Sequence, residues 1–262
     1  NDASTITDGD QLAINQSPDY EIQSSYAIEV RATDPLGGTF DQTFTIEVQN
    51  VGEAPTDILL SSASVDENVP ANTVIGSLSV LGSGQGQTFT YSLVTGDGDT
   101  DNAAFTIDGS SLKINASPNF EVKDGYSVRV RAADSEDDSL AFEKEWTITV
   151  NDLNEAPVAL SLSATSIDEN APAESIVGTF TATDPDAGQS FAYSLVPGEG
   201  DADNPAFTID GSALILNPSP DYETKSSYSI RVQVSDNGSP LLSFGQSLTV
   251  TVQNVEEAPI VM

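Results

Sequence analysis

The sequence predicts an all-β protein made of tandem seven-stranded Greek-key β-sandwiches. Three observations lead to this prediction. Apolar and polar residues alternate with a period of two along short segments, no segment of helical length shows a period of 3.6, and the whole pattern repeats every 102 residues. A repeat of this length has the size of one sandwich domain and is too long for a solenoid unit.

The repeat is visible as motifs that recur at a constant offset. Val65–Asn68 reads Val-Asp-Glu-Asn, and Ile167–Asn170 reads Ile-Asp-Glu-Asn, 102 residues later. The same offset relates Tyr91 to Tyr193, Phe105 to Phe207, Pro118 to Pro220, Asp134 to Asp236, and Pro157 to Pro259. The two copies align without a gap, so the repeated unit is a whole domain.

Residues 1–54 match only the second half of this unit. Thr7–Gly9 aligns with Ile107–Gly109, and Asp19–Glu21 aligns with Asn119–Glu121. We therefore expect the C-terminal half of a truncated repeat over 1–54, complete repeats over 55–156 and 157–258, and the start of a following repeat over 259–262. On this interpretation, the chain is a piece of a longer tandem array.

Seven short strands are expected in each complete repeat. In the first complete copy they lie at residues 58–60, 74–80, 89–93, 105–107, 112–114, 126–132 and 146–150. The sixth is the clearest, because Tyr126, Val128, Val130 and Ala132 alternate with polar residues, as expected for a half-buried strand. The Asp108-Gly109 pair between two of the strands is a tight-turn signal.

The composition excludes several classes of function. The chain has no His and no Cys, so it lacks an imidazole base, a thiol nucleophile and a thiolate zinc site. Its formal net charge of −33 repels nucleic acids and anionic lipids, and no apolar stretch is long enough to insert into a membrane. We expect no enzyme activity, because the acids repeat with the domain, whereas a catalytic pair would occur once.

Acidic residues recur near the ends of the expected strands. Carboxylate and amide oxygens are the ligands that Ca²⁺ prefers in proteins. Loop carboxylates also cap turns and keep a surface soluble, so a purely solvated role is the alternative for any one of them.

The order and spacing of the motifs resemble cadherin repeats, particularly the cadherin-like repeats of large bacterial surface proteins. The motifs are Asp-Glu-Asn, Asp-Tyr-Glu, Asp-Pro-Asp-Ala-Gly, Ser-Asp-Asn-Gly-Ser-Pro and Asp-Leu-Asn-Glu-Ala-Pro. The resemblance covers nearly the whole chain. It implies an immunoglobulin-like architecture, an extracellular or cell-surface location, and Ca²⁺ bound between successive repeats.

The resemblance also implies which residues hold the metal. The best-supplied junction, between the two complete repeats, would use Glu67, Glu121, Asp152, Asn154, Glu155, Asp184, Asp186 and Asp236. At the preceding junction, Gly82 and Gly84 replace the two acids of Asp-x-Asp. A weak ion or none is expected there, with Asp19, Glu21, Glu53 and Asp134 as the remaining ligands. After the last repeat, Glu169, Asp221, Glu223 and Glu256 would serve a following domain.

A second acidic cluster lies inside each repeat. Asp97, Asp99 and Asp101 alternate with other residues, and the pattern recurs at Glu199, Asp201 and Asp203. The spacing is similar to an EF-hand loop, but its sixth position is not Gly and no helices flank it. Two interpretations remain, an intradomain calcium loop and a plain polar loop.

The predicted function is a calcium-rigidified spacer or adhesive scaffold within an extracellular adhesin or surface fibre. The alternatives are a polysaccharide-binding module and a structural filament subunit. Exposed aromatic residues would mark a sugar platform, but the recurring Tyr and Phe residues occupy strand positions typical of a core. The expected partners are other copies of the protein or a cell-surface or polysaccharide ligand. The half-repeat would be completed by missing upstream chain or by another chain.

Overall fold

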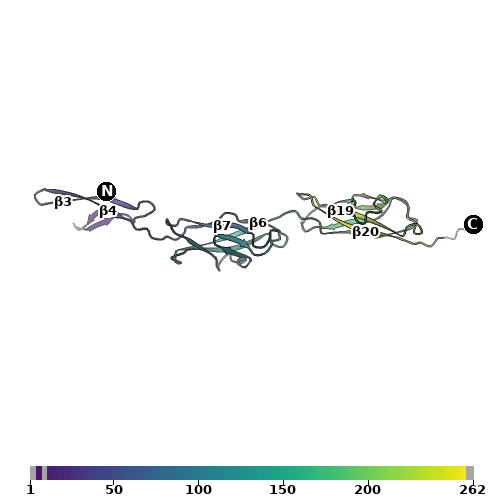
Figure 1. Cartoon of the computed structure of the whole chain (residues 1–262), viewed down its shortest axis with the longest axis horizontal. Coiled ribbons are helices and arrows are strands. Elements are labelled where there is room, and N and C mark those ends of the chain that lie inside the picture. Colours follow the sequence, from purple (N-terminus) through teal and green to yellow (C-terminus); the bar gives the residue numbers. More distant parts are fainter. Residues whose placement is uncertain (1–3, 8–10, 258–262) are drawn as a thin grey trace, which may run out of the picture. The chain divides into compact units, whose positions relative to one another are not determined.

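The computed structural model describes residues 4–7 and 11–257. The chain divides into two compact units, residues 1–151 and 152–262. Within the described ranges, all regular elements are strands except two short 3-10 helices, Asn102–Ala104 and Asn204–Ala206 (Figure 1). The predicted all-β class is therefore confirmed. The expected start of another repeat at 259–262 lies outside the described residues.

Residues 57–151 of the first unit form a sandwich of two four-stranded sheets. The sheet orders are β5-β7-β10-β9 and β6-β12-β11-β8. The strands are β5 Asp57–Leu60, β6 Ser64–Asp66, β7 Val74–Leu81, β8 Phe89–Leu93, β9 Phe105–Asp108, β10 Ser111–Ile114, β11 Gly125–Asp134 and β12 Ala141–Asn151. All pairs are antiparallel except β6 with β12, which is parallel.

The second unit repeats this topology, as the constant offset predicts. Its sheet orders are β13-β15-β18-β17 and β14-β20-β19-β16. The strands are β13 Ala159–Leu162, β14 Ser166–Asp168, β15 Ser175–Thr183, β16 Ala192–Leu195, β17 Phe207–Asp210, β18 Ala213–Leu216, β19 Ser227–Ser235 and β20 Ser243–Gln253.

Each of these two described sandwiches has one strand more than the seven expected. The additional strand, β6 or β14, has three residues and runs parallel to the last strand of its domain. It forms because the chain leaves one sheet after β5 or β13 and joins the other. Three residues carry too little alternation to be recognised as a strand in the sequence.

Inward-facing residues of both sheets form the core of each sandwich. Val128, Val130 and Ala132 of β11 are fully buried, which confirms the alternation predicted for this strand. Tyr126 packs edge-to-face on Phe105 with 5.4 Å between ring centroids. Such a contact, which recurs between Tyr228 and Phe207, adds to the stabilisation from apolar burial.

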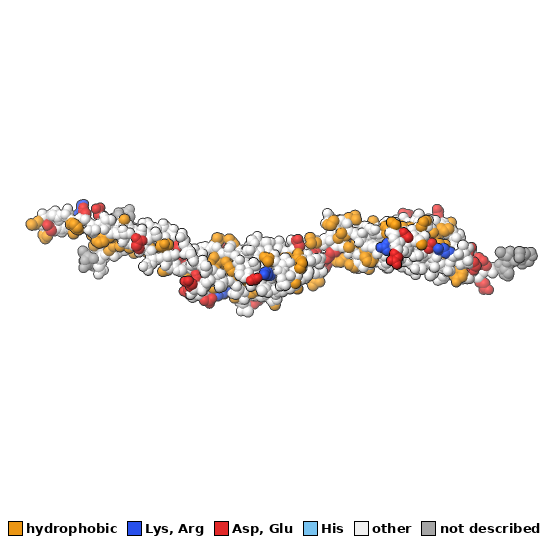
Figure 2. Space-filling model, viewed as in Figure 1, with side chains coloured by type: hydrophobic (Ala, Val, Ile, Leu, Met, Phe, Trp, Pro, Cys, Tyr) orange, Lys and Arg blue, Asp and Glu red, His pale blue; other side chains and the backbone are white. Residues whose placement is uncertain are grey.

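Residues 4–7 and 11–47 contain two antiparallel strand pairs. In these, β1 (Ser4–Thr7) pairs with β2 (Gln11–Ile14) and β3 (Ser25–Thr33) pairs with β4 (Thr39–Glu47). Leu12 and Ile14 are 47% and 50% exposed, whereas the equivalent Leu112 and Ile114 of the first sandwich are 0% and 2% exposed. Figure 2 shows hydrophobic side chains on the visible surface of these strand pairs.

The Asn of each Asp-Glu-Asn motif has a conformational role. Asn68 and Asn170 both have a φ of 60°, in the left-handed region that Asn tolerates better than most residues. Their N–H groups donate to the carbonyl oxygens of Pro118 and Pro220, each at 2.9 Å. The turn therefore fixes the position of the Glu that precedes each Asn.

A neighbouring position provides a test of backbone strain. Asn72 has a φ of 66°, and its equivalent Glu174, a residue much less suited to this region, has a φ of 63°. We expect Glu174→Asn to stabilise the second sandwich by roughly 0.5–1 kcal/mol, because it relieves left-handed strain. Urea denaturation followed by circular dichroism measures the change.

The reciprocal variant is the control. Asn72→Glu should destabilise the first sandwich by a similar amount, and the fluorescence of Trp146, the single Trp of the chain, reports on that domain alone. An unchanged midpoint in both variants would contradict the strain argument.

Candidate metal sites

The second unit contains a cluster of three carboxylates. Glu169, Asp221 and Glu223 each bring a carboxylate oxygen within 4.8 Å of the other two. Glu169 directly follows β14, and the other two lie between β18 and β19. No Lys or Arg of the described residues forms an ion pair with any of them.

Glu169 is held in place by backbone groups. Only 4% of it is exposed, and its two carboxylate oxygens accept hydrogen bonds from the N–H groups of Tyr222 at 3.0 Å and Val255 at 2.6 Å. These two donors keep the pKa of Glu169 below its ordinary value despite burial. Glu169 is therefore a fixed carboxylate that favours its ionised form, the form that binds a metal ion.

The pKa of Glu223 is shifted in the opposite direction. Its own backbone amide lowers its pKa, but burial and the neighbouring Glu169 and Glu257 outweigh this and raise the pKa above the ordinary value. Asp221 accepts hydrogen bonds from the Thr224 N–H and hydroxyl, which lower the pKa of Asp221. Glu169 and Asp221 thus favour their charged forms, and Glu223 is repelled by its neighbours, a repulsion that a hard cation would relieve.

A second group of oxygens lies where the chain enters this unit. Asp184 and Asp186 follow β15, and Asp236 follows β19. The Asn154 amide donates to Asp236 Oδ2 at 2.9 Å, and the Glu155 N–H donates to Asp186 Oδ2 at 2.8 Å. Five of the predicted ligands are therefore connected within one small network.

Asp184 is the carboxylate of this network whose charged form has the least support. Its Oδ2 is buried and has no hydrogen-bond partner among the described residues. Burial raises the pKa of Asp184, and the nearby charges of Asp186 and Asp236 raise it further, against the lowering effect of the Asp186 N–H. A buried carboxylate oxygen beside two like charges needs a cation or a proton.

Asp236 stays charged for a different reason. It is only 3% exposed, and burial would raise its pKa, but the Leu242 N–H, the Asn154 amide and the Gly238 N–H lower it below the ordinary value. The residue presents a fixed negative charge to the same pocket.

The first unit presents the remaining predicted ligands. Glu67 is 1% exposed, and its Oε2 accepts the Phe120 N–H at 2.9 Å, as Glu169 does with Tyr222. Glu121 is exposed next to Phe120. Of the eight ligands predicted for this junction, these two belong to the first unit and the other six, beginning with Asp152, belong to the second.

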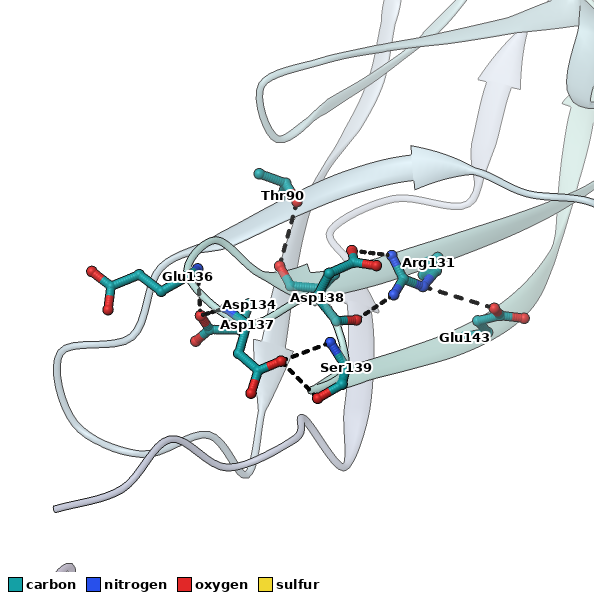
Figure 3. Close-up of polar contacts among 9 residues, drawn as sticks. Thr90, Arg131, Asp134, Glu136, Asp137, Asp138, Ser139 and Glu143 are labelled. Atoms are coloured by element: carbon teal, nitrogen blue, oxygen red, sulfur yellow. Dashed lines mark hydrogen bonds and ion pairs between the residues drawn. The ribbon is translucent and has the colours of Figure 1, made fainter.

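At the junction between the half-repeat and the first complete repeat, most of the predicted ligands accept hydrogen bonds from the protein. Asp134 Oδ1 accepts the N–H groups of Glu136 and Asp137 (Figure 3). Asp134 Oδ2 accepts the Gln87 amide at 2.6 Å. Asp19 accepts the Ile22 N–H at 3.1 Å. The other two predicted ligands also lie next to polar groups: the Glu21 carboxylate accepts the Gln85 N–H, and the Glu53 N–H donates to Gln87.

The sequence analysis did not identify Gln87 or its equivalent Gln189 as part of these sites. Gln87 donates to Asp134, and the equivalent Gln189 donates to Asn154 Oδ1 at 3.1 Å and accepts the Asn237 N–H at 3.3 Å. The recurrence of this glutamine at the offset of 102 is the sequence feature that could have identified it. In the second unit this glutamine orients Asn154, whereas in the first it bonds the carboxylate itself.

The acidic loop inside each repeat has a structural contact. Asp101 forms an ion pair with Lys123, and it accepts the Ser127 N–H at 2.8 Å. Neither Asp97 nor Asp99 joins a carboxylate cluster with it among the described residues. These contacts favour the polar-loop interpretation, because both carboxylate oxygens of Asp101 already have a partner in the Lys123 ammonium and the Ser127 N–H.

The comparisons with known proteins agree with this architecture. Residues 163–253 match the family model of the cadherin domain. This match covers most of the second sandwich. The chain is 29% identical over 250 residues to Protocadherin Fat 4 of Homo sapiens, which covers 91% of this chain and 5% of that protein. It is 28% identical over 260 residues to the Protocadherin-like wing polarity protein stan of Drosophila melanogaster, covering 95% and 7%.

Solved structures show the same fold. Protocadherin Gamma B7 extracellular cadherin domains 1-4 superpose with a TM-score of 0.61 at 24% identity, covering 92% of this chain and 60% of that one. The protocadherin gammaB7 EC3-6 cis-dimer structure gives a TM-score of 0.56 at 25% identity, covering 92% and 61%. The chain spans less than two thirds of either structure.

These findings establish the fold and a similarity to cadherin domains. Residues 163–253 resemble a cadherin domain, and most of the chain aligns with a short segment of each of the much longer protocadherins. The curated relatives named above are animal proteins, so the expected bacterial origin gains no support. No helix within the described residues has the length and apolarity to span a membrane.

The loop ion pairs make the stability depend on pH. Burial alone would raise the pKa of Asp203, but the Lys225 ammonium at 2.7 Å and the Ser229 N–H lower it below the ordinary value. A carboxylate with a lowered folded pKa stabilises the domain above its unfolded pKa of about 3.9, and this contribution disappears as the pH falls through the folded pKa. Asp203→Asn should therefore be less stable than the parent at pH 7, with a difference that shrinks below about pH 4.

Thermal denaturation from pH 3 to pH 8 measures this difference. The control Asp210→Asn removes the same charge from an exposed position in the β17–β18 turn. A destabilisation of Asp203→Asn that stays constant over the whole range would show that the effect is not electrostatic.

Proposed function

We propose that this chain is a calcium-stiffened spacer that holds an adhesive surface at a distance from the cell that carries it. The observation that supports this most directly is the buried, unbonded Oδ2 of Asp184 beside Asp186 and Asp236. A spacer built of independent sandwiches needs a device that stiffens its joints, and these carboxylates provide one.

The proposed metal ligands are the eight residues that the sequence assigns to the junction of the two complete repeats. Within the second unit, Asn154, Asp184 and Asp236 fit Ca²⁺ because they offer oxygens from three separate segments of the chain. Glu67 has the same backbone support as Glu169, so we assign it the same role. Bound Ca²⁺ would neutralise carboxylates from both sides of the connector, the segment that contains Asp152, Asn154 and Glu155, and would so restrict its motion.

The strength of the joints should differ along the chain. At the preceding junction, Gly82 and Gly84 stand where the next repeat has Asp184 and Asp186, and the Gln87 amide occupies Asp134. Fewer charged oxygens mean weaker binding, so we assign this joint a lower affinity and greater flexibility.

Lateral association with other copies belongs to the same proposal. The related protocadherin gammaB7 EC3-6 fragment is described as a cis-dimer. In this chain, the apolar side chains of the two N-terminal strand pairs, including Leu12 and Ile14, are half exposed. Such a surface favours contact with a partner that covers it.

Thermal melts with calcium and with chelator test the proposal. For a site with a Kd of about 0.1 mM, 1 mM Ca²⁺ should stabilise the chain by about 1.4 kcal/mol. The double variant Asp184→Asn, Asp186→Asn should lose most of this gain, because it removes two charged ligands from the best-supplied site.

The matched control is Asp97→Asn, Asp99→Asn, which removes the same charge from the loop of the first sandwich. It should keep the full calcium response. An equal melting temperature of the parent with calcium and with chelator would exclude the metal site, and a loss of response in the loop variant alone would move the site to the loop.

A further inference from the structure

Nearly every cation of this chain is already paired. Seven of the eight Lys and Arg side chains lie within 4.0 Å of a carboxylate of the described residues. The exception is Arg231 on β19. In a protein with 41 acidic residues, an Arg without a carboxylate partner is an unusual feature.

The equivalent residue of the first sandwich shows what is missing. Arg129 forms an ion pair with Glu143 at 3.0 Å and donates to the Asp97 carbonyl oxygen at 3.0 Å. Arg231 keeps the second contact, to the Glu199 carbonyl oxygen at 3.4 Å, but the position of Glu143 is Gly245. The guanidinium of Arg231 therefore has N–H groups, at Nε and Nη2, without an acceptor among the described residues.

The strand face around Arg231 carries neutral polar side chains, and the acidic loop 199–203 lies beside it, because Ser247 and Ser229 donate to the carbonyl oxygens of Glu199 and Gly200. The strands β16, β19 and β20 are adjacent, and Arg231 lies opposite Ser247 in the ladder. The outward positions that surround it are Ser194, Ser229, Gln233, Gly245, Ser247 and Thr249. Hydroxyl and amide groups of this kind can both donate and accept hydrogen bonds.

We propose that this face binds a carboxylated polysaccharide, with Arg231 holding one uronate carboxylate. A guanidinium recognises a carboxylate with two parallel N–H···O bonds, and the Ser194, Gln233 and Thr249 side chains suit the hydroxyls of the neighbouring sugars. A protein partner fits less well, because protein interfaces depend on buried aromatic or aliphatic anchors and these positions offer none. The site does not depend on calcium.

Retention on immobilised polygalacturonate tests this site. In about 0.15 M salt the distant acids of the chain are screened beyond ~8 Å, so a direct Arg–carboxylate contact can be measured. We expect Arg231→Gln to weaken retention about tenfold, the loss of one charge-assisted bidentate contact. Arg131→Gln is the matched control, because Arg131 is already paired with Asp138 and its loss changes the net charge equally.

A second pair of variants separates recognition from folding. Gly245→Glu rebuilds the ion pair found between Arg129 and Glu143, so it should weaken retention at least as much as Arg231→Gln while Arg231 remains. Thr147→Glu adds the same charge to the first sandwich and should have no effect. Neutral dextran should not retain the parent.

Three outcomes would overturn the proposal: equal retention of Arg231→Gln and the parent, retention that disappears with chelator, or no retention of the parent. The second would show that calcium bridges the acids of the protein to the uronates. Each variant is compared with the parent by circular dichroism, so that a folding defect is recognised separately.

Discussion

Carboxylates that the fold buries without a lysine or arginine beside them are the constraint on which the rest of this protein depends. Glu67, Asp134, Glu169 and Asp236 are the buried charged residues of the chain that the structure describes. Backbone N–H groups and side-chain amides satisfy part of their hydrogen bonding, for example at Glu169 and Asp236. The remaining negative charge needs a cation from outside the chain.

The β-sandwich creates this situation through its topology. Asp184 and Asp236 follow β15 and β19, which belong to different sheets of one sandwich, and the connector residue Asn154 reaches Asp236. Strands that end at the same edge bring acids from distant parts of the sequence into one pocket. Part of the net charge of −33 therefore comes from carboxylates that we propose as metal ligands, and the few cations serve other purposes. Lys123 and Lys225 fix loops within the domains.

The sequence was sufficient to predict the fold because its strongest signal is long-range repetition. A gapless offset of 102 residues defines the domain, and the alternation of Val128 and Val130 defines the sixth strand. The short strand β6 could not be predicted, since three residues carry no recognisable period. The left-handed turn at Asn68 was present in the motif, but its conformation needs the hydrogen bond to Pro118, 50 residues away.

The candidate sites were less predictable than the fold. Glu169, Asp221 and Glu223 follow from the resemblance, and the structure gathers them. The contacts of Gln87 and Asp101 depend on which partner lies opposite each side chain, Asp134 or Lys123, and spacing along the chain does not contain this information. Arg231 stands out only when the ion pair of its equivalent, Arg129, is known.

Calorimetric titration of the chelator-treated chain with Ca²⁺ tests the central claim most directly. The account predicts saturable binding with a dissociation constant of about 0.1–1 mM or tighter, at more than one site per chain, because the second unit alone holds two sets of carboxylates. Heats that show no saturable binding up to about 10 mM, well above the range of extracellular calcium modules, would contradict it.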